Sequence, residues 1–147
     1  MHDRRNEIQQ RLTGRDPAPE LTPLQPYDAV TAADIEYLAA PELVKIGLHL
    51  LNDDLPRAHT LAQSLEGDSS ADYWHAIIHR REGDFSNAKY WLRRVGPHPI
   101  LVATYGNAAG AAQFVDDCRD AGEDDAELRE KQRREIAALL EYVEREE

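Results

Sequence analysis

A repeat with a spacing of 30 residues is the feature that most constrains this fold. Residues 41–65, PELVKIGLHLLNDDLPRAHTLAQSL, align without gaps on residues 71–95, ADYWHAIIHRREGDFSNAKYWLRRV. Each copy has a helical segment, a turn that ends at Asp54 or Asp84, and a second helical segment with an alanine near its start. A single helical hairpin leaves one apolar face uncovered, so two copies should stack and bury it. The repeat therefore predicts two stacked helical hairpins over residues 41–96.

Periodicity and helix-ending residues predict helices in the rest of the chain as well. Residues 31–40 and 107–121 are two further predicted helices, the first with Thr31 as its N-cap. Residues 124–147 contain the longest stripe of apolar residues at helical spacing, and no segment alternates as a strand does. We therefore expect an all-α protein of about six or seven short helices. Its two stacked hairpins resemble tetratricopeptide repeats, and a long C-terminal helix should pack against them.

The N-terminal part of the chain differs from the rest in its proline content. The stretch GRDPAPELTPLQP, residues 14–26, holds four prolines. Proline fixes φ and removes a backbone donor, which favours an extended segment. We therefore predict an N-terminal arm or linker over residues 1–30 and a single helical domain over residues 31–147. The arm should be dispensable to the fold, with Leu21, Leu24 and Tyr27 holding it on the body.

Charge and composition argue against several classes of function. The net charge of −11 disfavours nucleic-acid binding, which requires basic surface. The least charged stretch, residues 95–115, is interrupted by Gly, Pro, His and Asn, so no membrane span is expected. The N-terminus has no apolar signal core, and the single cysteine, Cys118, excludes a disulfide framework. Together these features predict a cytoplasmic protein with no nucleic-acid or membrane partner.

The segment DYWHAIIHRRE, residues 72–82, contains a candidate metal site. On a helix its apolar residues gather on one side, while Asp72, His75 and His79 fall on the other. Histidines four residues apart rise from successive turns, which allows two imidazoles to chelate one metal ion. His75 and His79, with Asp72 as a third ligand, are thus candidates for binding a divalent metal. The HExxH spacing of zinc proteases is absent, because Ala76 stands where the general base would be.

Two further groups of basic side chains are candidates for ligand binding. His49 matches His79 in the repeat, so stacking of the first helices should bring it to the same surface. Arg80, Arg94 and His98 are predicted to converge on an anionic group such as a phosphate or a carboxylate, which suits arginine.

Two other side chains are predicted to be structural. Arg81 projects toward the apolar side near Trp74, so it needs a partner such as Glu135 or Asp84. Cys118 has acidic neighbours, which disfavour a reactive thiolate and favour packing in or near the core.

Three blocks follow one another in the second half of the chain: WHAIIHRREGDFSNAKYW at residues 74–91, FVDDC at 114–118 and EKQRREIAALLEY at 130–142. In this order they resemble a group of bacterial hypothetical proteins with a W-H-A-I-x-H-R-R-E-x-D-x-x-N-A-K-Y-W block and a later Q-R-R-E helix. The resemblance covers residues 41–147. It implies an all-helical bacterial protein and supplies no catalytic residues.

These patterns leave three functions open. The first is a non-catalytic module that binds a protein or peptide, since no complete set of nucleophile and base is visible. The second is a metal-binding protein or small metal-dependent enzyme that uses His75 and His79. The third is a binder of a small anionic ligand at the arginine and histidine cluster. No cofactor other than a divalent metal is expected. The predicted partner surface comprises His49, Asp72, His75, His79, Arg80, Arg94 and His98.

Overall fold

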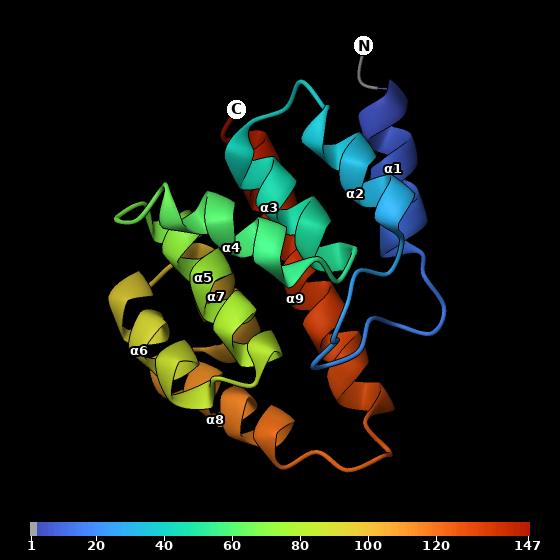
Figure 1. The fold of residues 1–147 in the computed structure, drawn as a ribbon. Helices are drawn as coiled ribbons and strands as arrows, with labels where there is room; N and C mark the ends of the chain where they lie inside the picture. Colours follow the sequence, from blue (N-terminus) through green and yellow to red (C-terminus); the bar gives the residue numbers. More distant parts are fainter. Residues whose placement is uncertain (1–2) are drawn as a thin grey trace.

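The computed structural model describes residues 3–147, and this part of the chain forms nine α-helices and no strand (Figure 1). The all-α class predicted from the sequence is therefore confirmed. None of the described helices is both long and apolar enough to cross a membrane. The helices are α1 (Asp3–Thr13), α2 (Ala29–Glu36), α3 (Glu42–Leu51), α4 (Leu55–Gln63), α5 (Ser69–Glu82), α6 (Phe85–Val95), α7 (Pro99–Tyr105), α8 (Ala108–Arg119) and α9 (Ala126–Arg145).

Helix α5 lies at the centre of the fold. It contacts α3, α4 and α6, and every residue from Ser70 to Arg81 is buried. A helix that is covered on all sides belongs to the core whatever its polarity. The polar side of α5, which the sequence pattern assigns to solvent, therefore faces neighbouring helices.

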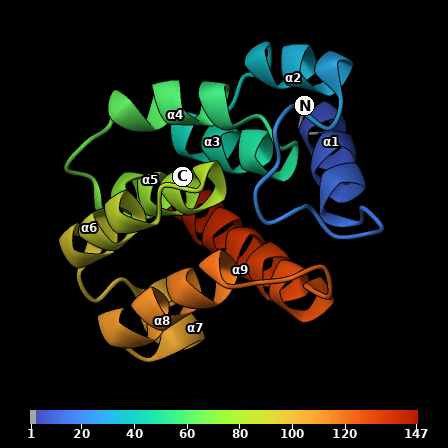
Figure 2. The same cartoon turned by 60° about the horizontal axis from the view of Figure 1, so that its bottom comes forward.

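The main apolar core lies between α3, α5 and α9. Trp74 of α5 is fully buried, and its indole N–H donates to the Leu43 carbonyl at 3.0 Å. A Cβ atom at Gly47 would come within 2.9 Å of the Trp74 ring, so this position of α3 requires glycine for the helices to approach. Helix α9 covers α3 and α7, whereas α7 and α8 lie at the opposite end of the molecule from α1 and α2 (Figure 2).

The N-terminal segment is part of this core. Ile8 and Leu12 of α1 are fully buried in the main cluster, and Leu21 packs with Phe114 and Cys118 in a second one. Leu24, by contrast, is 100% exposed and does not hold the segment in place. We therefore revise the expectation of a dispensable arm, because residues before position 30 supply core side chains.

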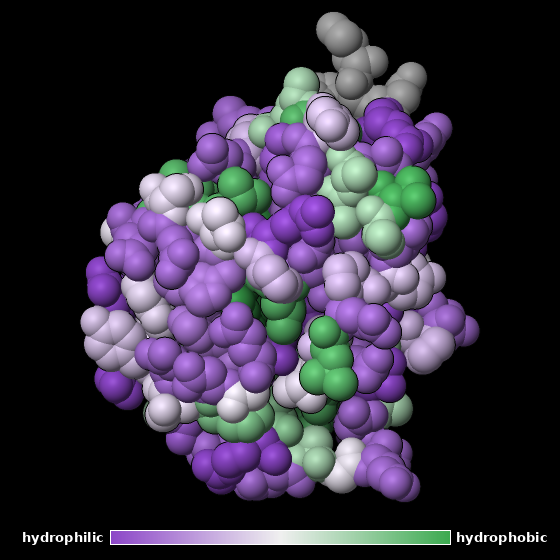
Figure 3. Space-filling model, viewed as in Figure 1, coloured by the Kyte–Doolittle hydropathy of each residue, from purple (hydrophilic) through white to green (hydrophobic). Residues whose placement is uncertain are grey.

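The surface of the molecule gives little indication of a single apolar binding face. Figure 3 shows, on the side seen in Figure 1, a largely hydrophilic surface on which the hydrophobic patches are separated from one another. Separate exposed apolar side chains are normal for a globular protein.

One helix boundary differs from the predictions, and one helix was not predicted. The N-cap of α2 is Asp28, whose Oδ1 accepts from the Val30 N–H at 3.1 Å, and Thr31 lies inside the helix. The predicted cap at Thr31 is wrong because a better acceptor stands three residues earlier. Helix α7 was not expected. It begins at Pro99, a residue that suits the first turn, and the His98 imidazole accepts from the Ile100 N–H.

Arg81 links three parts of the chain. Its guanidinium, fully buried, donates to the Leu50 carbonyl at 2.6 Å, the Glu20 carbonyl at 2.8 Å and Asp53 Oδ1 at 2.7 Å. The structural role predicted for Arg81 is confirmed. The predicted partners were wrong, however, because the charged partner is Asp53, which also pairs with Arg15 at 3.0 Å.

Candidate metal centre

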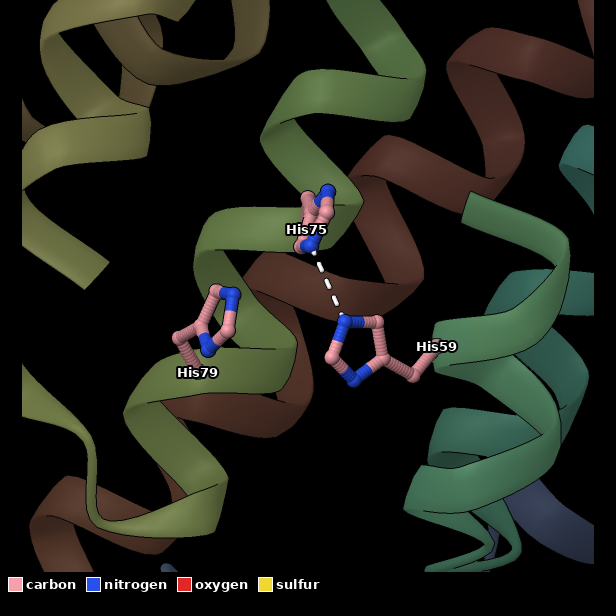
Figure 4. Close-up of side chains that lie close together, drawn as sticks. All are labelled: His59, His75 and His79. Atoms are coloured by element: carbon pink, nitrogen blue, oxygen red, sulfur yellow. Dashed lines mark hydrogen bonds between the residues drawn. The ribbon is translucent and has the colours of Figure 1, made fainter. Parts of the chain in front are cut away.

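Three histidines meet where α4 crosses α5. His75 and His79 project from successive turns of α5, and His59 reaches them from α4 (Figure 4). The atoms His75 Nε2 and His59 Nε2 lie 3.2 Å apart. One nitrogen from each of the three rings can be chosen so that all three lie within 4.8 Å of one another. Three imidazole nitrogens at such distances can converge on a single ion.

The separations can be compared with those in a real zinc centre. With Zn–N distances of about 2.0–2.1 Å and tetrahedral angles, two imidazole nitrogens on one zinc ion lie about 3.3–3.4 Å apart. The His75–His59 pair, at 3.2 Å, already meets this requirement. The widest separation, 4.8 Å, exceeds it by about 1.4 Å. Binding of one ion therefore requires the rings to move closer together by up to this amount.

Glu82 lies against the outer edges of two of the rings. Its Oε2 is 3.3 Å from His59 Nδ1, and its Oε1 is 3.1 Å from His79 Nδ1. In metal-binding histidines, a carboxylate at one ring nitrogen fixes the tautomer and leaves the other nitrogen for the ion. Glu82 is therefore placed to leave the Nε2 lone pairs of His59 and His79 available.

The buried environment favours the neutral imidazole, the form of histidine that binds a metal. Burial, with smaller contributions from His79, His59 and Arg94, lowers the pKa of His75 from 6.5 to about 4. Burial also lowers the pKa of His79, against the opposing effect of Glu82. The His75 ring stacks on Trp91 with ring centres 3.9 Å apart, which closes the inner side of the cluster. At neutral pH a metal would not compete with protons at His75 or His79.

Burial of these histidines makes a prediction for the metal-free protein. Below pH 6.5 the unfolded chain takes up a proton at His75, whereas the folded chain resists protonation down to about pH 4. Because the unfolded state then binds more protons, the free energy of unfolding should fall as the pH falls through this window. Urea unfolding at pH 7.5, 6 and 5 measures the slope, which His75→Gln should reduce. Equal slopes for the two proteins would contradict the burial argument.

Two predicted residues of the site lie elsewhere. Asp72 Oδ1 accepts from the Gly67 N–H at 3.2 Å and is not among the three converging ligands. His49 is fully buried on α3, with its Nε2 3.4 Å from Glu36 Oε1. The predicted surface shared by His49, His75 and His79 is therefore not formed, and His59 takes the third place. His59 is 16 residues from His75, so no helical spacing in the sequence links them.

The predicted anion cluster is not assembled either, because its three members have separate partners. Arg80 is buried and pairs with Glu135 at 2.9 Å. The Arg94 guanidinium lies 4.6 Å from the centre of the Trp91 ring, and His98 Nε2 is 2.9 Å from Ser70 Oγ. Charge pairing in the core and stacking on an indole account for both arginines.

The contact between Ser70 and His98 resembles half of a serine-nucleophile site, but its hydrogen bonding has the wrong direction. His98 Nδ1 accepts from the Ile100 N–H at 3.1 Å. A neutral imidazole then carries its proton on Nε2, which must donate to Ser70 Oγ. A general base needs a free lone pair at that nitrogen, so the pair cannot activate the hydroxyl.

Comparison with protein-family models, curated proteins and solved structures found no match to this chain. The resemblance to bacterial hypothetical proteins therefore stays a prediction from the sequence. The side chains that converge around His75 are the best available guide to function.

Proposed function

We propose that this protein binds one divalent transition-metal ion between α4 and α5 through His59, His75 and His79. The convergence of three imidazoles, two of them backed by the Glu82 carboxylate, is the observation that supports the proposal. Imidazole ligands suit zinc, copper, nickel and cobalt, whereas magnesium and calcium prefer oxygen. Three histidines form a known ligand set of zinc, and zinc is the ion we favour.

The charges around the cluster support a divalent cation. Each histidine binds a metal as a neutral imidazole, so the three rings add no charge to the site. Two carboxylates lie close by: Glu82, and Asp84, whose Oδ2 is 3.7 Å from His79 Nδ1. A doubly charged ion would balance both of them, and a partly buried charge is more stable when balanced.

A zinc titration of the metal-stripped full-length protein tests the proposal. We expect binding of one equivalent, and at a free zinc concentration about 100 times the Kd a stabilisation of about 2.7 kcal/mol. The Trp91 indole stacks on His75, so its fluorescence should report binding. The double variant His75→Gln, His79→Gln should lose both the binding and the rise in melting temperature. His98→Gln, which removes a histidine outside the cluster, is the matched control. Equal zinc binding by the wild type and the double variant would refute the proposal.

Glu82→Gln should weaken zinc binding about 10- to 100-fold, the usual effect of losing a carboxylate behind a metal-binding histidine. Glutamine has only one accepting oxygen, so it cannot replace both carboxylate oxygens that lie beside His59 Nδ1 and His79 Nδ1. The melting temperature of the metal-free variant should change little, because Glu82 is partly exposed and such pairs contribute weakly to stability. A loss of metal-free stability matching the loss of affinity would indicate a purely structural role.

We also infer that the α3–α4 and α5–α6 pairs are two copies of one tetratricopeptide-like hairpin. Their turns support this inference: Asp54 has φ, ψ of −94°, 77° and Asp84 has −95°, 73°. Each of these residues donates its N–H to an equivalent carbonyl, that of His49 or His79, at 2.9 Å. Binding of a protein or peptide by such hairpins stays a prediction. Its surface would have to lie away from the buried His75 and His79.

A further inference from the structure

We propose that the ion keeps one open coordination position, which holds water at rest and exchanges it for a small anion. This inference rests on the proposed metal site. Zinc in proteins is commonly four-coordinate, and a site with three protein ligands leaves the fourth position to water or to an added ligand. The position stays open if no fourth protein side chain can reach the ion.

Glu82 is the nearest candidate, and both of its oxygens are engaged elsewhere. Each oxygen lies against an Nδ1 atom, on the ring edges of His59 and His79 that face away from Nε2. Asp84 approaches the same edge, with its Oδ2 3.7 Å from His79 Nδ1. Both carboxylates are therefore placed to orient the histidines rather than to bind the ion at their Nε2 atoms.

Two other side chains suited to a transition metal do not converge with the three histidines. Asp72 is tied to the Gly67 turn, and Cys118 packs with Leu21 and Phe114. Within residues 3–147, the group able to converge on one ion contains three histidines only. The protein thus offers three ligand atoms to an ion that takes four.

Solvent can reach the site from one side. His75 is backed by Trp91, which closes the interior, but the side chains of His59 and Glu82 are 25% and 31% exposed. His59 lies on α4 and Glu82 is the last residue of α5, so the exposed edge of the cluster lies where these two helices meet. A single open position takes one ligand atom, so a monodentate anion is the class of ligand that can replace the water.

Cobalt(II) and azide provide the test. The metal-free full-length protein is loaded with one equivalent of cobalt(II), and its visible d–d spectrum is recorded as azide is added. We expect a saturable spectral change with one azide per cobalt in the wild type, and the same change in His98→Gln, which alters a histidine outside the cluster. Glu82→Gln, loaded to the same extent, tests whether Glu82 itself holds the fourth position.

The other outcomes contradict either the open position alone or the metal site as well. If cobalt binds and azide leaves the wild-type spectrum unchanged, the position is closed and the inference is wrong, although the metal site stands. A response in Glu82→Gln alone would identify Glu82 as the fourth ligand and would also overturn the inference. Failure of the wild type to bind cobalt, after failing to bind zinc, would remove the proposed function and the inference together.

Discussion

Replacing Arg81 with methionine should lower the free energy of unfolding by about 3–5 kcal/mol, the usual cost of removing one partner of a buried ion pair. Arg81 is fully buried, and it satisfies two carbonyl oxygens and the Asp53 carboxylate. Methionine fills a similar volume but leaves these acceptors unpaired. Arg15, 3.0 Å from Asp53, compensates only part of that charge. Urea unfolding of the two proteins measures the difference.

A second substitution separates the lost charge pair from lost packing. In the double variant Arg81→Met, Asp53→Asn, no carboxylate remains to be compensated but Arg15 also loses its ion pair, so only part of the stability should return. If Arg81→Met lowers the free energy of unfolding by less than about 1 kcal/mol, the average effect of a single substitution, then the buried network is not important for stability.

Deleting residues 1–27 should abolish the cooperative unfolding transition. Ile8 and Leu12 are fully buried in the main core, and emptying one such site costs about 2–5 kcal/mol. The deletion also removes the Glu20 carbonyl that Arg81 binds and the Arg15 guanidinium that pairs with Asp53. The summed loss is comparable to the total stability of a domain, about 5–15 kcal/mol. Thermal unfolding followed by circular dichroism measures the effect.

Two milder variants make this result interpretable. Leu12→Ala should lower the midpoint clearly while the chain still folds, whereas Leu24→Ala, at a 100% exposed position, should leave it unchanged. A truncated chain that unfolds cooperatively near the original midpoint would restore the earlier expectation of a dispensable arm.

Local structure was largely predictable from the sequence. Gly83 ends α5 in the left-handed region at φ 81°, as its place after the periodic segment predicts. Asp54 and Asp84 occupy matching turns, as the 30-residue repeat indicates. His75 and His79 stack with ring centres 4.8 Å apart, on the one helix face that their four-residue spacing predicts. All of these depend on contacts within a helix or across one turn, which sequence spacing determines directly.

The environment of each helix face was decided only by the tertiary structure. The polar side of α5 appears solvent-exposed in a helical projection, yet α4 and α6 cover it, and His59 arrives from α4 to complete the histidine cluster. Arg81 pairs with Asp53 rather than with Glu135, and Ile8 packs in a core whose next members after Leu12 are Ile35 and Val44. Helical periodicity states which side chains share a face. Which helices a given face contacts depends on how all the helices pack together. No pattern of residue spacing in the sequence indicates these long-range contacts.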